Sequence, residues 1–394
     1  MPAYREITII KPNIIKWLIL SHGFKEEELG EFSNRAKIKP SRLEALISEK
    51  SHPLWLEIER MSDVLHINPY LFYLKEEIDR FSNSKLLPKD YRRAYKNTSP
   101  ESLEDRVELT KAVNKVRTLQ NEANELTSFL DESPNPELSS DITLNTNAEE
   151  IASKIRTESS ISKEKQKSCR DEKIVFNLFR SFIESKNILV FDINFKSKIT
   201  RGFSLADAYP FVIVIRHSDT ASARIFTLLH EYGHLLIRQG GLCGLSFETR
   251  NNNLESWCNR FAAEFIMPKA YFEEDLKSSP FSTKLVGHLA KEYKVSREAV
   301  LIKLKAMGKI TDETFHYQQG KIMHKSYSFK PGGGPAKKGS EGRNFANEKI
   351  NEVGQKFISL TNRSLTLNKI TYRDALNLID VKEKIYEKIR NISK

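Results

Sequence analysis

Apolar residues recur at three- and four-residue spacing through most of this chain, which predicts a mainly helical protein. Near the N-terminus, short polar or glycine-containing turns separate such segments at residues 12–20, 26–36, 40–49, 53–65 and 69–74. Short helices joined this closely predict a compact five-helix bundle.

A longer amphipathic pattern follows the bundle. It runs from Leu103 to Leu130 and predicts a single helix that packs either within the chain or against a second copy, as in a homodimer. Residues 133–147 are rich in Ser, Asn, Pro and Asp and are expected to form an exposed loop. Helices are then predicted at 148–157 and 169–184.

The pattern changes to β-branched and aromatic runs broken by turns before it becomes helical again. These runs lie at Ile188–Phe195, Ile199–Phe203 and Phe211–Ile215, and they predict the strands of a small sheet. Two helices around a short turn are expected at 283–293 and 296–307, with Ser296 as the N-cap of the second.

The C-terminal region begins with a glycine-rich basic linker at 330–339, which lacks the GxxxxGK[ST] order of a phosphate loop. Helices are predicted at 347–360 and 372–379, the second capped by Thr371. We therefore expect an α+β protein, mostly helical, with four regions. They are an N-terminal domain at 1–80, a linker and amphipathic region at 81–165, a sheet-containing domain at 166–325 with a helix pair at 281–310, and a linker with a helical tail at 326–394.

The chemistry is concentrated in the pentad His230-Glu231-Tyr232-Gly233-His234, which lies in the apolar run 225–237. Residues four apart share a helix face, so His230 and His234 can bind one metal ion while Glu231 reaches a water molecule beside it. Gly233 is unusual here, because glycine inside a helix costs about 1 kcal/mol relative to alanine. Close approach of a backbone or a substrate would explain it. The alternative is an amphipathic helix whose histidines are merely packed or solvated.

A tetrahedral catalytic zinc site needs a third protein ligand, and a second helix downstream, ending near Met267-Pro268, offers two carboxylates. Glu255 and Glu264 are nine residues apart, about 900° of helical rotation, so only one of them can face the first helix. We favour Glu255, which shares a face with Asn259 and with small residues. Its alternative role is to stabilise a helix N-terminus. For Glu264 a surface role or a role behind the ligands is expected.

These motifs resemble the ImmA/IrrE metallopeptidases. The resemblance rests on Phe226–His234, Glu255–Asn259 and Phe261–Pro268, and extends to the stretches 202–207, 210–214 and 295–300. It implies a minimal zincin-like zinc metallo-endopeptidase with ligands His230, His234 and Glu255 and with Glu231 as the catalytic base. It also implies limited proteolysis of a regulator, such as an Xre-type repressor or an antitoxin, in a mobile-element, stress or phage-defence system.

A peptidase of this kind can hold an extended substrate by backbone pairing with an edge strand. Phe211–Ile215 lies nearest to the pentad in sequence and is either that edge or a core strand without a substrate role. No residue is assigned as the oxyanion donor. The alternative function is a DNA-binding regulator or toxin–antitoxin component with a silenced or structural metal site, against which an intact Glu231 argues.

Composition indicates a soluble, cytoplasmic protein without a membrane segment. Charged residues make up 29% of the 394 residues and the mean hydropathy is −0.49. The three cysteines, Cys169, Cys243 and Cys258, form no CxxC pair, which fits a reducing compartment. Cys258 could be a soft zinc ligand, but a packed thiol beside Glu255 is the favoured interpretation.

The net charge of +11 suggests an acidic partner such as double-stranded DNA. The N-terminal pattern resembles an Xre/Cro-like helix-turn-helix, in which Lys37, Lys39, Ser41 and Arg42 would begin the recognition helix and meet DNA. The resemblance is incomplete, because the helix carries Glu44 and Glu49, so operator binding and a docking domain that no longer reads DNA both stay open. In the later helix pair, Lys303, Lys305 and Lys309 could contact phosphates or simply belong to a buttress.

Overall fold

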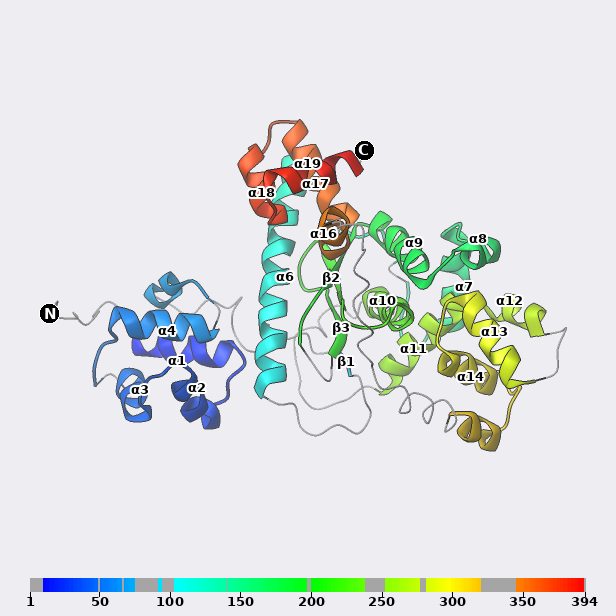
Figure 1. The fold of residues 1–394 in the computed structure, drawn as a ribbon, viewed down its shortest axis with the longest axis horizontal. Helices are drawn as coiled ribbons and strands as arrows, with labels where there is room; N and C mark the ends of the chain where they lie inside the picture. The colour runs from blue at the N-terminus through cyan, green and yellow to red at the C-terminus, as the bar shows by residue number, and fades with distance from the viewer. Residues whose placement is uncertain are drawn as a thin grey trace, which may run out of the picture. The chain divides into compact units, whose positions relative to one another are not determined.

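The computed structural model describes residues 10–48, 50–65, 67–74, 91–93, 103–139, 141–196, 200–237, 252–276, 281–319 and 345–392. The chain divides into two compact units, one formed mainly by residues up to Leu119 and the other mainly by residues from Gln120 onward (Figure 1). Each unit has its own buried apolar core. Among the described residues, no helix combines the length and the apolar character needed to cross a membrane.

The N-terminal unit is a small helical bundle, as the spacing of apolar residues predicts. It contains α1 (Pro12–Ser21), η1 (Glu26–Glu28), α2 (Leu29–Arg35), α3 (Pro40–Ile47), α4 (Trp55–Leu65) and η2 (Pro69–Tyr73), followed by the short strand β1 (Tyr91–Arg93). The fifth predicted helix is therefore a 3₁₀ turn. Phe32, Leu46 and Met61 are fully buried at the centre of the bundle.

The long amphipathic segment forms one helix, α6 (Leu103–Phe129). Its last turns pack within the second unit, where the Gln120 amide donates hydrogen bonds to the carbonyls of Ala208 and Pro210 at 3.0 and 2.8 Å. Ala123 and Leu126 are buried on the same stretch. This part of the helix is therefore packed within the chain, the first of the two predicted alternatives.

The second unit is built around a small sheet of β2 (Ile188–Ile193), β3 (Thr200–Leu205) and β4 (Phe211–Arg216). β4 lies between the other two strands, antiparallel to β3 and parallel to β2. The suggestion that Phe211–Ile215 is a substrate-binding edge is thus wrong. The backbone groups of β4 are used by two neighbouring strands, so it is a core strand.

Helices cover both faces of this sheet. α9 (Glu172–Ser185), α10 (Ala221–Leu236) and α11 (Asn252–Ile266) share one apolar core with Val190 and Ile213. On the opposite face, Phe191 contacts Phe357 edge to face at 6.0 Å between ring centroids. The mainly helical α+β architecture is thereby confirmed, with the sheet as the middle layer of the unit (Figure 1).

Five smaller helices are grouped to one side of α11 (Figure 1). They are α7 (Ala148–Glu158), α8 (Lys163–Ser168), α12 (Lys269–Leu276), α13 (Thr283–Tyr293) and α14 (Arg297–Ala306). The α13–α14 pair and its Ser296 cap are confirmed, and the turn between them places Lys294 at φ 57°. The α8 helix was not predicted. It precedes Asp171, whose side chain caps α9 and so delays the start of the helix predicted from residue 169.

Lys303 is not available to a phosphate, which was one of the two roles considered for the lysines of this helix pair. Its side chain is buried and forms an ion pair with Glu264. Lys305 pairs with Asp312 at 2.9 Å and lies over the ring of Phe315. The contacts of these two lysines therefore favour the buttress interpretation.

The C-terminal helices are α16 (Phe345–Val353), α17 (Gln355–Thr366), α18 (Tyr372–Ile379) and α19 (Glu383–Ile392). The prediction of one helix over 347–360 is wrong, because the chain breaks at Gly354, where φ is +85°. A Cβ there would lie 2.8 Å from the Val190 carbonyl oxygen and still closer to the Glu184 carboxylate. The predicted linker at 330–339 lies outside the described residues.

Two residues of α9, Glu184 and Arg180, bind the chain on either side of Gly354, and Arg180 also binds β2. Burial raises the pKa of Glu184 although Arg180 opposes it, and the same carboxylate accepts the backbone N–H groups of Gln355 and Lys356 at the start of α17. Arg180 donates to the carbonyls of Asn351 (2.6 Å) and Val190. The C-terminal helices are consequently an integral part of the second unit.

Candidate metal centre

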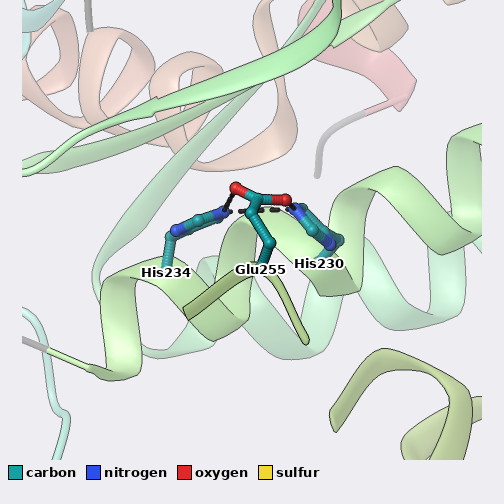
Figure 2. A group of neighbouring side chains, drawn as sticks. All are labelled: His230, His234 and Glu255. Atoms are coloured by element: carbon teal, nitrogen blue, oxygen red, sulfur yellow. Dashed lines mark hydrogen bonds and ion pairs between the residues drawn. The ribbon is translucent and has the colours of Figure 1, made fainter. Parts of the chain in front are cut away.

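Two helices bring together three side chains of types that can bind a metal ion. His230 and His234 come from successive turns of α10, and Glu255 comes from the first turn of α11 (Figure 2). The two Nε2 atoms are 3.1 Å apart, and each lies 3.3 Å from a different oxygen of the Glu255 carboxylate. Within the described residues, these form the one group of three or more His, Cys, Asp and Glu side chains with metal-ligand spacing.

The donor set fits zinc. Zinc in proteins is bound tetrahedrally by imidazole nitrogen and carboxylate oxygen at about 2.0–2.2 Å, which puts neighbouring ligand atoms about 3.3 Å apart. The separations of 3.1 and 3.3 Å match this requirement. Three protein ligands would leave a fourth position for water or substrate, as catalytic zinc sites do.

The site is buried on one side and accessible on the other. The side chains of His230 and His234 are 0% and 6% exposed, whereas that of Glu255 is 42% exposed. A substrate would therefore approach past Glu255. Burial opposes the charge of this carboxylate, but hydrogen bonds from His230 and His234 hold the pKa of Glu255 well below its usual range.

Gly233 allows α10 and α11 to approach closely. A Cβ at this position would lie 3.3 Å from both the Cα and the Sγ of Cys258. The close backbone approach anticipated from this glycine is thus present, and it is an approach between the two ligand-bearing helices. Cys258 itself is buried and stands outside the ligand group, so it is a packed thiol.

Two consecutive residues of α11 orient the imidazoles from behind. The Asn259 side-chain oxygen is 3.1 Å from Nδ1 of His230, and the Cys258 thiol is hydrogen-bonded to His234. Such partners fix the tautomer and the ring orientation of metal-ligating histidines. Sequence reasoning did not assign this role to Asn259, although its position four residues after Glu255 places it on the same helix face.

Glu231 lies on the side of α10 that faces β3. It is fully buried, and its Oε2 accepts a hydrogen bond of 3.0 Å from the hydroxyl of Ser204 on β3. Glu231 is not a member of the ligand group. A carboxylate next to the metal site but not bound to it can serve as a general base.

The start of α10 is tied to β2 by a buried ion pair. Arg224 binds the carboxylate of Asp192, and its guanidinium lies 4.3 Å above the ring of Phe176. His217 approaches the same carboxylate at 3.2 Å. Because Asp192 belongs to the sheet and Arg224 to the helix, this contact sets the position of α10 relative to the strands.

We expect Gly202→Ala to disrupt the candidate site. A Cβ at residue 202 would lie 2.6 Å from Thr227 Cγ2 and 2.7 Å from the Val214 carbonyl oxygen, so β3 would have to move away from α10. Overpacking of this kind costs about 1–3 kcal/mol. Thermal unfolding and zinc binding by calorimetry measure the effect. Gly30→Ala is the control because nothing beyond its chain neighbours and the nearby backbone of its own helix lies within 4 Å of a Cβ there, and its Tm should not fall. An unchanged Tm for Gly202→Ala would contradict the prediction.

Glu264 lies neither at the surface nor behind the metal ligands, which corrects both expectations for this residue. It is 4% exposed, pairs with Lys303, and accepts the backbone N–H of Lys269 at 2.7 Å. Its place opposite Glu255 on α11 directs it towards α12 and α14. The two carboxylates do lie on different sides of α11, but the side that carries Glu264 is also covered by protein.

The predicted DNA-contacting residues lie around the start of α3. Lys37, Lys39 and Ser41 are exposed. Arg42 is partly buried, and its guanidinium donates to both carboxylate oxygens of Glu57 and to the carbonyl of His52. These hydrogen bonds join the start of α3 to the start of α4, and the expected contact of Arg42 with DNA stays a prediction.

Comparison with known families agrees with the location of this site. Residues 183–305 match the Peptidase_M78 family model, described as an IrrE N-terminal-like domain. The match begins at the end of α9, ends within α14, and includes all three ligand-type residues and Glu231. Neither the curated proteins nor the solved structures contain a significant match to the chain. The family match supports a metallopeptidase-family function for this part of the molecule.

Proposed function

We propose that this chain is a zinc-dependent endopeptidase in which His230, His234 and Glu255 hold the metal and Glu231 acts as the general base. The observation that carries the proposal is the set of separations among the three ligand atoms, 3.1 and 3.3 Å, beside a buried carboxylate that does not belong to the set. The match of residues 183–305 to a peptidase family supports it.

The proposed chemistry is hydrolysis of a peptide bond. Zinc, when bound, supplies a Lewis acid that polarises the scissile carbonyl and promotes ionisation of water. Glu231 takes a proton from the attacking water and later delivers it to the leaving amine nitrogen as the C–N bond breaks. Asn259 and Cys258 keep the two imidazoles oriented. Burial of the histidines excludes bulk water from one side of the site.

The substrate class follows from the resemblance to ImmA/IrrE peptidases. We propose limited proteolysis of a regulatory protein, with an Xre-type repressor or an antitoxin as the expected target. The exposed Glu255 side is the face on which such a protein would bind. The N-terminal helical unit, with Lys37, Lys39 and Ser41 exposed, is proposed to bring DNA or the regulator to the enzyme.

Removal of the metal is expected to abolish cleavage. The purified chain is incubated with a purified Xre-type repressor in the presence of zinc, or after treatment with 1,10-phenanthroline, and the products are identified by mass spectrometry. We expect defined fragments with zinc, none after chelation, and recovery when zinc is restored. Operator binding in a gel-shift assay by a zinc-loaded chain that cuts nothing would favour a regulator with a silenced site.

A further inference from the structure

Ser204 makes a hydrogen bond at the candidate active site that the three proposed zinc ligands do not account for. Its hydroxyl donates a hydrogen bond of 3.0 Å to Oε2 of Glu231. Glu231 is fully buried, and Ser204 is partly exposed at the edge of the site. A buried carboxylate is stabilised in its charged form, and in one orientation, by such a donor.

The position of Ser204 is set by the sheet. Gly202 and Ser204 are two residues apart on β3 and therefore point to the same face. The Cβ position of Gly202 lies 2.6 Å from Thr227 and 3.6 Å from Glu231 Cγ, so this face of β3 rests on α10. Both residues are in register with β4, as Gly202 pairs with Ile215 and Ser204 with Ile213. The hydroxyl is thus held by a paired strand.

We propose that Ser204 is a positioning residue that keeps the Glu231 carboxyl group in one orientation through both halves of its proton transfer, an inference that rests on the proposed peptidase function. A serine hydroxyl has one donor and two acceptor sites. It donates to Oε2 of Glu231 while the carboxylate is ionised, and it keeps donating to Oε2 while the other carboxyl oxygen carries the proton taken from water. When Glu231 passes that proton to the amine nitrogen, this hydrogen bond is unchanged and Ser204 keeps its own proton.

The kinetic test compares Ser204→Ala, Ser204→Thr and Ser222→Ala on a fluorogenic peptide that spans a bond cut by the wild-type chain. We expect kcat of Ser204→Ala to fall about 10- to 100-fold, as for other groups that orient a reacting residue, with KM changed less than about twofold. Ser204→Thr, which retains the hydroxyl, should recover most of the rate. Ser222 lies on α10, where its hydroxyl is 3.4 Å from that of Thr220, and its variant should match the wild type.

A second measurement does not depend on activity. In the zinc-free protein, thermal unfolding of Ser204→Ala, Glu231→Ala and the double variant forms a double-mutant cycle. Because each single change removes the same hydrogen bond, the loss of Tm in the double variant should be smaller than the sum of the two single losses. Bound zinc, measured by elemental analysis, should equal the wild-type value in Ser204→Ala.

The outcomes separate this inference from the function it rests on. Full kcat in Ser204→Ala, failure of Ser204→Thr to recover the rate, or additive Tm losses would overturn the role of Ser204 and leave the peptidase proposal standing, provided that Glu231→Gln is inactive. A zinc-loaded wild-type chain that cleaves neither repressor nor peptide would overturn both.

Discussion

Glu231→Gln is expected to lower the rate of peptide hydrolysis by about 10²- to 10⁴-fold, the usual contribution of a general acid–base group. Glutamine has nearly the same shape and can still accept the hydrogen bond from Ser204, but it cannot take a proton from water. Glu231 is outside the ligand group, so zinc content should stay at the wild-type value. Single-turnover cleavage and elemental analysis measure the two quantities.

The matched control is Glu150→Gln, which makes the same chemical change at an exposed position in the first turn of α7. It should cleave at the wild-type rate. Equal rates for Glu231→Gln and the wild type would remove Glu231 from the mechanism. Loss of zinc together with activity would instead assign Glu231 to the metal site.

Glu264→Ala is expected to reduce the free energy of unfolding by about 3–5 kcal/mol, because removing one partner of a buried ion pair leaves an uncompensated charge. The side chains of Glu264 and Lys303 are 5% and 9% exposed. Glu264 also accepts the backbone N–H of Lys269 at the first residue of α12. One substitution therefore weakens the contacts of α11 with both α12 and α14. Denaturation by guanidinium chloride, followed by circular dichroism, gives the change.

Two further variants test whether the loss of stability in Glu264→Ala comes from the unpaired buried charge. Glu264→Leu combined with Lys303→Met should be more stable than Glu264→Ala, because apolar side chains of similar size leave no buried charge. Glu313→Ala, at an exposed position, should lie within about 0.5 kcal/mol of the wild type. A loss below about 1 kcal/mol for Glu264→Ala would show that water reaches Lys303 in solution.

The elements that could be predicted from the sequence are those defined by local patterns. Ser296 and Thr371 begin helices because their side chains accept the backbone N–H groups of Ala299 and Asp374, contacts within one turn. The spacing of His230, His234 and Glu255 likewise follows from helix geometry and the close approach of two helices. These features depend on residues that are near in sequence or on a single helix face.

Features that depend on distant contacts could not be predicted. β4 is the central strand because of its pairing with both β2 and β3, which its own sequence does not specify. Gly354 breaks a helical pattern because Glu184 and the Val190 carbonyl occupy the space of a side chain. Ser204 reaches Glu231 only through the register of β3 on β4.

The ion-pair partners of some charged residues could not be predicted from the sequence either. Lys303 and Arg42 lie in sequence patterns that predict a basic surface. Each instead forms an ion pair within the protein, Lys303 with Glu264 and Arg42 with Glu57. A single sequence gives no sign of these pairs, since the partners are 39 and 15 residues away. Sequence alone therefore overestimates the positive surface available to nucleic acid.

The helices after residue 345 belong to the same compact unit as the candidate metal centre. The family match ends at residue 305, but α16 and α17 lie against β2, and Phe357 covers Phe191. A protein shortened to the matched region would uncover an outermost strand and an aromatic ring, a combination that promotes strand-to-strand association between molecules. Loss of the helices from residue 345 onward would thus favour aggregation of the remaining chain.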